Sequence, residues 1–187
     1  KEVLVGLGLL EIRNVVIVSR FLQFESMGLE ADESSIFKIE NSLISGQDIL
    51  RNSLLPLLVD TIGHNIHSSY PQNIFEVGKV FTKGGTETEK WHLCVAVAYN
   101  RADYTSIKSI LQAFLKVAFG KDVTTIPSSQ SGEYANGRSA DIMVEGKIVG
   151  RIGEISDSVM QSHRIRVPVA AYELDLSSFL FSFRGSI

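Results

Sequence analysis

Residues 73–85, NIFEVGKVFTKGG, form the stretch that decides the fold. Their first nine residues are rich in β-branched and aromatic side chains, and a polar loop with two glycines follows. This composition predicts a strand that runs into a turn. The segment WHLCVAVAY, residues 91–99, predicts a second strand, so the two should form a hairpin. Because a glycine-rich loop after a strand can bind phosphate, the hairpin is also the first place to look for a nucleotide site.

A long amphipathic helix is the second clear element. The segment DYTSIKSILQAFLKVAFG, residues 103–120, places apolar side chains three and four residues apart. Asp103 is suited to cap the first turn and Gly120 to end the helix. The resulting apolar stripe consists of Ile107, Ile110, Leu111, Phe114, Leu115 and Ala118.

The segment SGQDILRNSLLPLLVDTIGHNIH, residues 45–67, is harder to interpret because it contains Pro56. A helix that began at Ser45 would carry this proline in its interior, at a cost of about 3 kcal/mol. A helix that begins at residue 52 or 53 places Pro56 in the first turn, where no backbone donor is missed. We therefore predict a short strand over 48–51 and an amphipathic helix over 53–67. Its apolar face repeats every four residues, at Leu54, Leu58, Ile62 and Ile66.

The remaining segments complete an α+β pattern in one domain over 1–187. We predict a helix from residue 1 that stops at the Gly6 and Gly8 pair, a helix from Ser19 to Gly28, and a short helix over 156–164. Strands are expected over 14–19 (continuous and buried), 35–41, 122–127 and 167–176, with a hairpin over 139–155 that turns at Glu145 and Gly146. Successive hairpins with three or four helices between them imply a largely antiparallel sheet.

Composition narrows the classes of function. The net charge of −3 and the pI of 5.8 give no overall electrostatic footprint for nucleic acid. Cys94 has no second cysteine to pair with, which excludes an internal disulfide and is consistent with a reducing cytoplasm. No run reaches the about 18 apolar residues of a membrane-spanning helix. The chain starts at Lys1 on an apolar run without the pattern of a signal peptide, and we expect it to be a piece of a longer protein.

Few residues indicate chemistry by themselves. His64 and His67 are spaced to hold a metal on one helix face, but no third ligand is evident, and polar residues that complement a helix C-terminus are the simpler interpretation. Cys94 lies among valines and alanines, as an inert thiol does, and His92 is expected to be a sheet residue. Arg138 could clamp an anion or pair with a carboxylate at the sheet edge. The sequence therefore predicts no catalytic residue and no metal ligand.

Four motifs, in order, carry a resemblance to a known family: ILRNSLLPLL (49–58), NIFEVGKVF (73–81), NGRSADIMVEGKIVGRIGEI (136–155) and VAAYELDL (169–176). At these separations they resemble the catalytic-like domain in the C-terminal half of the phenylalanyl-tRNA synthetase beta subunit. The corresponding runs of that family are approximately LRTSLLPGLL, LFEIGxVF, GRSA with GxIGxxGEIHP, and ELDL. The resemblance spans about residues 1–180, and the stretch over 93–111 is similar to the archaeal and eukaryotic branch. The family's His-Pro pair is replaced by Ser156 and Asp157, so a role of that histidine does not transfer, although Ser156 can still cap a helix.

The resemblance implies a class II aminoacyl-tRNA synthetase fold, an antiparallel sheet flanked by helices. Working members of that class bind the α-phosphate of ATP through an arginine in their second motif, because a planar, permanently charged guanidinium suits phosphate. Aligned on this chain, Val80 and Phe81 match the motif's apolar pair, but Thr82 takes the place of the arginine and Gly84 that of a glutamate. The third motif should end in G-x-G-x-x-R, and residues 170–185 contain only the isolated Arg184. The resemblance thus implies no catalytic and no cofactor-binding residue here.

The same resemblance implies partners. In this family the beta subunit packs against an alpha subunit that carries the active site, in an α2β2 enzyme that charges tRNA(Phe) with phenylalanine. The resemblance therefore implies that the whole enzyme uses ATP and Mg²⁺. This domain is expected to bind no cofactor and to catalyse no reaction.

Three hypotheses follow for the domain. In the first it is a scaffold, and the helix face of Leu54, Leu58, Ile62 and Ile66 lies either in an intersubunit helix bundle or in the core of the same chain; both interpretations are open. In the second it is a diverged class II adenylating enzyme whose phosphate ligands are Lys79, Lys83 or Arg138. In the third it contacts tRNA directly, through Lys121, Arg164 and Arg166.

Overall fold

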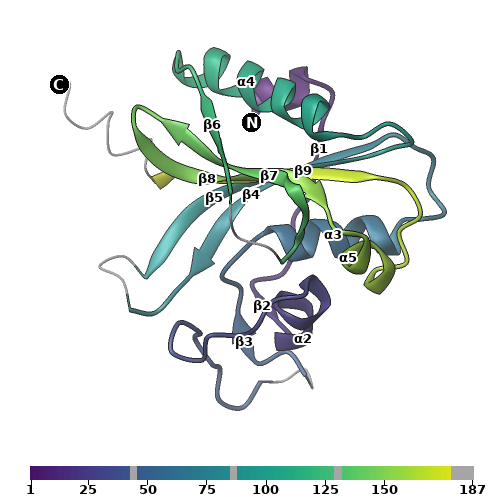
Figure 1. Ribbon diagram of the computed structural model, residues 1–187. Coiled ribbons are helices and arrows are strands. Elements are labelled where there is room, and N and C mark those ends of the chain that lie inside the picture. Colours follow the sequence, from purple (N-terminus) through teal and green to yellow (C-terminus); the bar gives the residue numbers. More distant parts are fainter. Residues whose placement is uncertain (43–45, 85–87, 129–131, 178–187) are drawn as a thin grey trace.

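The computed structural model of the protein describes residues 1–42, 46–84, 88–128 and 132–177 (Figure 1). The helices in chain order are α1 (Glu2–Gly6), α2 (Arg20–Gln23), the 3-10 helix η1 (Glu25–Met27), α3 (Leu55–His64), α4 (Tyr104–Phe119) and α5 (Asp157–Ser162). The strands are β1 (Leu10–Glu11), β2 (Ile17–Val18), β3 (Ile49–Leu50), β4 (Gln72–Phe81), β5 (Glu89–Ala98), β6 (Thr124–Pro127), β7 (Tyr134–Val144), β8 (Lys147–Ile155) and β9 (Val169–Asp175).

A seven-stranded sheet forms the centre of the molecule, in the order β1-β4-β5-β9-β8-β7-β6. All neighbours are antiparallel except β1 and β4, which are parallel. The hairpin of β7 and β8 turns at Glu145 and Gly146, which both have positive φ (51° and 79°), as a two-residue hairpin turn requires. The predicted α+β class with a largely antiparallel sheet is therefore confirmed.

Helices cover both faces of the sheet (Figure 1): α4 lies on one face, and α3 and α5 lie on the other. Side chains alternate along β5, so Leu93, Val95 and Val97 join the core under α4, while Cys94, Ala96 and Ala98 join the core under α3. The second set is small, which lets α3 lie close to the sheet. The parity of a residue on β5 therefore decides which core it belongs to.

Helix α4 has the ends that its sequence predicts. The Asp103 carboxylate accepts a hydrogen bond from Ser106 N, the Ser106 hydroxyl accepts one from Asp103 N, and Gly120 closes the helix in the left-handed region at φ 66°. Four members of the predicted stripe are buried, and Ala118, in the last turn, is exposed.

Helix α3 begins where Pro56 allows it to, with the proline in the first turn, as predicted. Its end was predicted too late, because the helix stops at His64 and Ile66 lies beyond it. The backbone leaves the helical range at the C-cap Asn65 (φ −100°, ψ 22°), whose side-chain amide donates to Thr61 O at 2.8 Å.

Two strand predictions near the N-terminus were wrong. Of residues 14–19 only Ile17 and Val18 form a strand, in a separate two-stranded sheet with β3, and Val15 and Ile17 are 61% and 39% exposed. A β-branched run indicates extended backbone, but it does not show that a second layer covers it. Residues 35–41 contribute only an isolated bridge between Lys38 and Ile49. The helix predicted over 19–28 is divided into α2 and η1, although the cap at Ser19 and the stop at Gly28 are confirmed.

Candidate functional site

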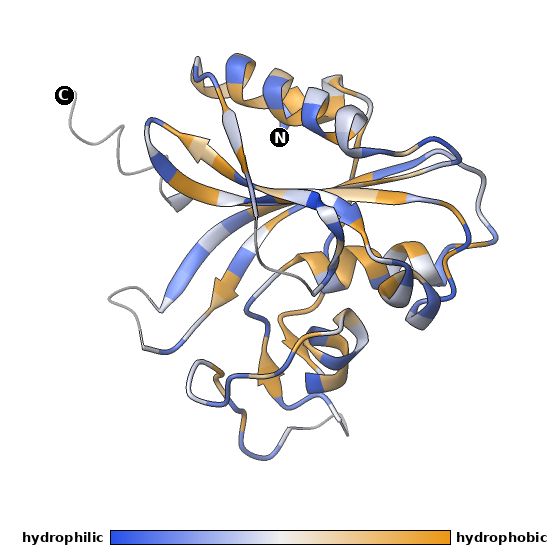
Figure 2. Ribbon diagram, in the orientation of Figure 1, coloured by the Kyte–Doolittle hydropathy of each residue, from blue (hydrophilic) through white to orange (hydrophobic). Residues whose placement is uncertain are grey.

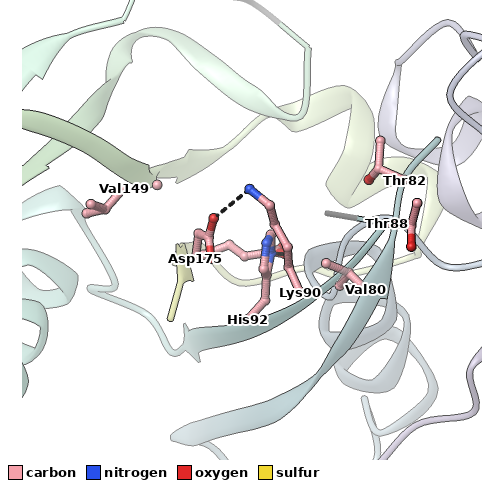
Figure 3. Close-up of a pocket in the computed structure, with 9 residues that line it drawn as sticks. Val80, Thr82, Thr88, Lys90, His92, Val149 and Asp175 are labelled. Carbon is pink, nitrogen blue, oxygen red and sulfur yellow. Dashed lines mark hydrogen bonds and ion pairs between the residues drawn. The ribbon is translucent and has the colours of Figure 1, made fainter. Parts of the chain in front are cut away.

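A cavity of 360 Å³ opens at the end of the β4–β5 hairpin, on the face of the sheet that carries α3 (Figure 3). Strands β4, β5, β8 and β9 and the start of the hairpin loop build it. Its lining residues are Val80, Thr82, Thr88, Lys90, His92, Val149, Gly150, Glu173 and Asp175. The hairpin that the sequence singled out as a nucleotide site therefore does line a concave site.

Thr82, which the resemblance aligns with the phosphate-binding arginine, lines this cavity. Its backbone N–H donates to Thr88 O at 3.1 Å, which closes the neck of the loop. A threonine hydroxyl offers one neutral donor where a guanidinium would offer five charged ones. The cavity therefore lacks the group that would neutralise an α-phosphate.

Glu173 on the central strand β9 is the most heavily bonded side chain in the cavity. Its carboxylate accepts hydrogen bonds from the Ser53 hydroxyl (2.7 Å), from Leu54 N (3.1 Å) and Leu55 N (2.9 Å), and from His92 Nδ1 (2.6 Å). Leu54 and Leu55 begin α3, so the carboxylate caps the helix from another part of the chain. Burial raises the pKa of Glu173, but the hydrogen bonds from His92, Ser53 and Leu54 outweigh it, and the net pKa is lowered.

Asp175 is paired as well. One of its oxygens lies 2.9 Å from Lys90 Nζ, and the other accepts a hydrogen bond from Ser177 N at 2.9 Å. Figure 3 shows the Lys90–Asp175 pair beside His92. The carboxylates and the lysine of the cavity are therefore paired within the chain, and they do not await a ligand.

This donor set does not fit ATP. The ionised side chains that line the cavity are two carboxylates and one lysine, which gives a formal charge of −1 against a polyanionic nucleotide. Phosphate oxygens would have to displace a 2.9 Å ion pair to reach Lys90, and would then face Asp175. The geometry supports no adenylation step here.

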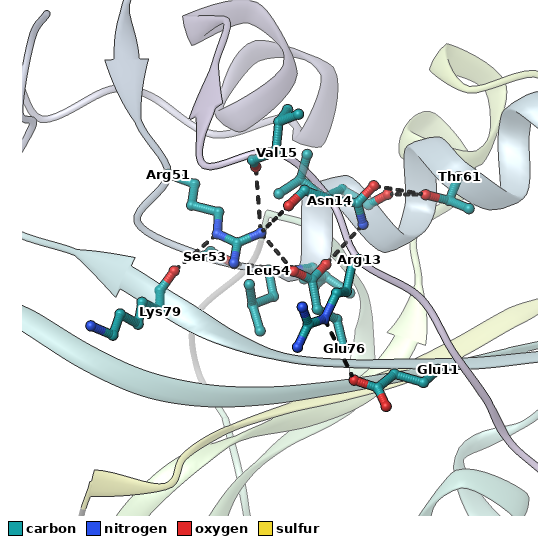
Figure 4. A network of polar contacts seen from close by, with 12 residues as sticks. Glu11, Arg13, Asn14, Val15, Arg51, Ser53, Leu54, Thr61, Glu76 and Lys79 are labelled. Atoms are coloured by element: carbon teal, nitrogen blue, oxygen red, sulfur yellow. Dashed lines mark hydrogen bonds and ion pairs between the residues drawn. The ribbon is translucent and has the colours of Figure 1, made fainter. Parts of the chain in front are cut away.

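Behind the cavity, a buried ion pair joins three parts of the chain (Figure 4). Arg51 Nη1 lies 2.7 Å from Glu76 Oε1, and both side chains are 3% exposed. Arg51 Nε also donates to Lys79 O (2.9 Å), and Asn14 Nδ2 donates to Glu76 Oε2 (2.8 Å). Gly78 makes room for the guanidinium, because a Cβ on it would lie 2.3 Å from Arg51 Nη2. Arg51 belongs to the ILRNSLLPLL motif and Glu76 to the NIFEVGKVF motif, so two of the four family motifs meet in one structural contact.

The alternative phosphate ligands do not line the cavity. Lys79 pairs with Glu89 at 2.6 Å, and Lys83 lies 5.2 Å from the centroid of the Phe37 ring. Arg138 pairs with Glu154 at 2.7 Å, so the interpretation of Arg138 as a structural arginine is the one that the structure supports. Arg138 lies on β7, whereas Lys79 and Lys83 belong to the β4–β5 hairpin, so the three cations do not form one cluster.

The predicted interface face of α3 belongs to the core of the same chain. Leu54, Leu58 and Ile62 are 0% exposed and pack into one buried cluster with Cys94 and its neighbours on β5. Of the two interpretations that the sequence left open for this face, their burial in this chain favours the core, and the interface stays a prediction. Ile66, beyond the helix, keeps partial exposure.

The three cations predicted to contact tRNA fall on two sides of the molecule. Lys121 follows α4 and contacts Glu145, whereas Arg164 and Arg166 follow α5 and are exposed on the opposite face of the sheet (Figure 1). They do not form one basic patch, and the contact stays a prediction at two separate places.

The surroundings of the histidines and of Cys94 indicate structural roles for these residues. Among the residues that the structure describes, no three His, Cys, Asp or Glu side chains lie close enough together to hold a metal ion. His64 contacts Asp60 (3.3 Å), and His67 lies outside α3. Cys94 is fully buried, and burial raises the pKa of its thiol.

Over the same described ranges, no helix has both the length and the apolar character needed to cross a bilayer.

Comparison with known proteins agrees with this geometry. Residues 1–176 match the family model described as "Phenylalanyl tRNA synthetase beta chain CLM domain". The chain belongs to this family. It is 36% identical to the phenylalanine–tRNA ligase beta subunit of Thermococcus sibiricus over 193 aligned residues, covering all of this chain, and 32% identical to that of Archaeoglobus fulgidus, covering 96% of it. The chain spans about a third of the length of these relatives (33% and 32%).

A solved structure shows the fold. The pyrrolysyl-tRNA synthetase PylSc of Desulfitobacterium hafniense superposes with a TM-score of 0.79 over 98% of this chain and 66% of its own, at 16% sequence identity. The beta-chain CLM domain thus has a class II synthetase fold.

Sequence reasoning singled out Thr82, which does line the cavity, but missed Glu173, His92 and Ser53 as a group. Glu173 lies 81 positions from His92 and 120 from Ser53 along the chain. Two of these residues do lie in the motifs of the resemblance, Ser53 in ILRNSLLPLL and Glu173 in VAAYELDL. No spacing rule connects such distant segments of the sequence.

Proposed function

We propose that this CLM domain is a non-catalytic scaffold of a phenylalanine–tRNA ligase beta subunit, within an α2β2 enzyme that ligates phenylalanine to tRNA(Phe). One observation carries the proposal: the class II cavity has Thr82 in place of the arginine, and its carboxylates are bound by the chain's own groups. In the whole enzyme, ATP and Mg²⁺ are used at a site outside this domain, and the enzyme works in the cytoplasm.

The surface for the alpha subunit is the N-terminal apolar surface. In the described part of the chain, eleven large apolar residues are exposed, and seven of them lie between residues 5 and 21: Val5, Leu7, Leu10, Val15, Val16, Ile17 and Phe21. They follow the chain from α1, which lies beside α4, past the edge strand β1 to β2 and α2, which lie near α3 on the other side of the sheet (Figure 1). They therefore form a band along one edge of the sheet, and exposed apolar residues that follow one another along an edge are more typical of a protein interface than scattered single ones. This surface replaces the α3 face as the proposed contact.

Co-expression with the cognate alpha subunit tests the scaffold role. Leu10→Asp and Phe21→Asp replace side chains that are 67% and 66% exposed, so the isolated chain should keep its stability and lose most of its association. Ile148→Asp is the matched control, because Ile148 is 63% exposed on β8, which is separated from the edge strand β1 by β4, β5 and β9. Unchanged co-purification of both aspartate variants would remove this surface from the proposal.

Calorimetry of Mg-ATP, with and without phenylalanine, tests the absence of a nucleotide site. No heat of binding is expected at millimolar nucleotide. Binding at micromolar affinity would show that groups other than an arginine at residue 82 hold phosphate, and the domain would then be a diverged adenylating enzyme.

A further inference from the structure

A second groove lies on the other face of the sheet, between the first half of α4 and strands β6 and β7. Its volume is 380 Å³, within the range of about 300–1,000 Å³ that is usual for small-molecule sites. The lining residues are Tyr104, Lys108, Thr125, Pro127, Gly137, Arg138, Ser139 and Ala140. No carboxylate is among them, in contrast to the cavity under Thr82.

Two cations flank this groove with hydrogen-bonding capacity to spare. Lys108 Nζ donates to the Thr125 hydroxyl at 3.1 Å and forms no ion pair with any residue that the structure describes. Arg138 uses one nitrogen on Glu154, and its side chain is 64% exposed. An ammonium has three donors and a guanidinium five, so donors remain on both for an anion. Glu154, the nearest acid, is already shared between Arg138 Nη1 and Tyr104 N (3.1 Å).

The groove also has an aromatic and apolar part, beside the polar Thr125 and Ser139. The Tyr104 ring lies 5.6 Å from Lys108 Nζ, so the aromatic face and one cation are neighbours. Pro127 and Ala140 supply apolar contact, and Gly137 leaves space, because a Cβ on it would meet nothing within 4 Å. An aromatic plane beside two cations suits a ligand with a planar ring and a phosphate, because bases stack on aromatic side chains and arginine binds phosphate through its planar fork.

We propose that this groove holds one nucleotide, with its base against Tyr104 and its phosphate between Lys108 and Arg138. The proposed function supplies the source: the nucleotide is a residue of the tRNA that the whole enzyme charges, and in this respect the inference rests on that function. A free mononucleotide has the same chemistry and is separated from RNA by the test.

The test measures binding of a tRNA(Phe) transcript as a function of salt, for the beta chain alone and for its complex with the alpha subunit. Lys108→Gln and Arg138→Gln should each weaken binding and reduce the slope of log K against log salt by about 0.7–0.9, the value of one phosphate contact. Tyr104→Leu should weaken binding about fivefold or more without changing the slope, because stacking releases no counterion. Thermal melts establish that each variant is folded.

Lys116→Gln is the matched control, since Lys116 lies on the same helix, is 60% exposed and pairs with Asp122 outside the groove. If the three groove variants behave like this control, the proposal is overturned, whether or not the two subunits assemble. Ultraviolet crosslinking of a 4-thiouridine tRNA should label peptides that contain Tyr104 or Arg138, and labels only elsewhere would contradict the site. AMP that competes with this crosslink at micromolar concentration would assign the groove to a free nucleotide, and no competition assigns it to RNA.

Discussion

Replacing Glu173 by alanine tests whether the hydrogen bonds to this carboxylate stabilise the fold. The substitution removes the acceptor of the Ser53 hydroxyl, of two backbone N–H groups at the start of α3, and of His92. A hydrogen bond to a charged group contributes about 1.5–3 kcal/mol, and a lost helix cap costs about 1 kcal/mol. Water from the adjoining cavity will satisfy part of the loss. We therefore expect the free energy of unfolding to fall by about 3–5 kcal/mol, as it does when one partner of a buried pair is removed.

Urea unfolding followed by far-UV circular dichroism measures this difference. For a domain of this size, each kcal/mol lowers the melting temperature by about 2–4 °C, so a loss of about 10 °C is expected in a thermal scan. The control is Glu89→Ala, because Glu89 is an acidic residue of the same sheet that is 45% exposed in its pair with Lys79. That exposed pair contributes about 0–1 kcal/mol. A loss below 1 kcal/mol for Glu173→Ala would refute the helix-capping role.

The pH dependence gives the same test an independent arm. The pKa of Glu173 in the folded chain is below its ordinary value of 4.5, because the hydrogen bonds it accepts outweigh the effect of burial. A carboxylate whose folded pKa is depressed adds stability that is complete above its unfolded pKa and is lost as the pH falls through the folded one. The difference in unfolding free energy between wild type and Glu173→Gln should therefore shrink as the pH falls below 4.5. A difference that grew on acidification would contradict the sign of this shift.

Three further predictions concern other buried groups. Arg51→Met should cost about 3–5 kcal/mol in urea unfolding, because it leaves Glu76 charged and buried, and the double variant with Glu76→Met should recover part of it; equal losses for both would contradict this. Gly150→Ala places a Cβ 2.0 Å from a backbone carbonyl oxygen of β9 and should prevent folding. In the control Gly6→Ala the new Cβ meets nothing within 4 Å, so this variant should be neutral or stabilising. Soluble yield and melting temperature measure both effects. Cys94 is buried with a raised thiol pKa, so it should react with a disulfide reagent only as fast as the chain unfolds, and rapid labelling in the native state would show that it is accessible.

The parts of the fold that sequence predicted well are those in which local pattern and tertiary packing agree. Helix α4 has a periodic stripe, a capping residue and a glycine stop, and all three act at their predicted positions. The β7–β8 hairpin likewise combines strand composition with a local turn. Prediction failed at residues 14–19, where β-branched residues suggest a buried strand, and at 35–41, where alternating side chains suggest a strand, because both segments lie outside the main sheet. Burial depends on which layer covers a segment, and that information is not local.

In the candidate site, too, the features that a local motif specifies could be predicted, and those that depend on tertiary packing could not. The loss of the phosphate-binding arginine was visible at Thr82, because a motif specifies one position and one residue type. The replacement for it was not visible, because Glu173, His92 and Ser53 come together only when β9, β5 and the start of α3 are packed. The apolar face of α3 shows the reverse case. Its period correctly indicated burial, but period alone does not distinguish the core of one chain from the interface between two.

The internal partners of the two cavity carboxylates are consistent with a face that binds no phosphate. A carboxylate that accepts four hydrogen bonds from the chain is stable without a ligand, whereas a phosphate site keeps donors free and stores the cost of their desolvation until a nucleotide arrives. Once Glu173 caps α3, an arginine returned to residue 82 would meet a cavity whose lysine is already neutralised by Asp175. The hydrogen-bond donors at the start of α3 bind the Glu173 carboxylate of β9, and so they are not available to a phosphate on this face. On the α4 face, by contrast, Lys108 donates only to a neutral hydroxyl, and Arg138, paired with Glu154 through one nitrogen, keeps further donors for the proposed anion.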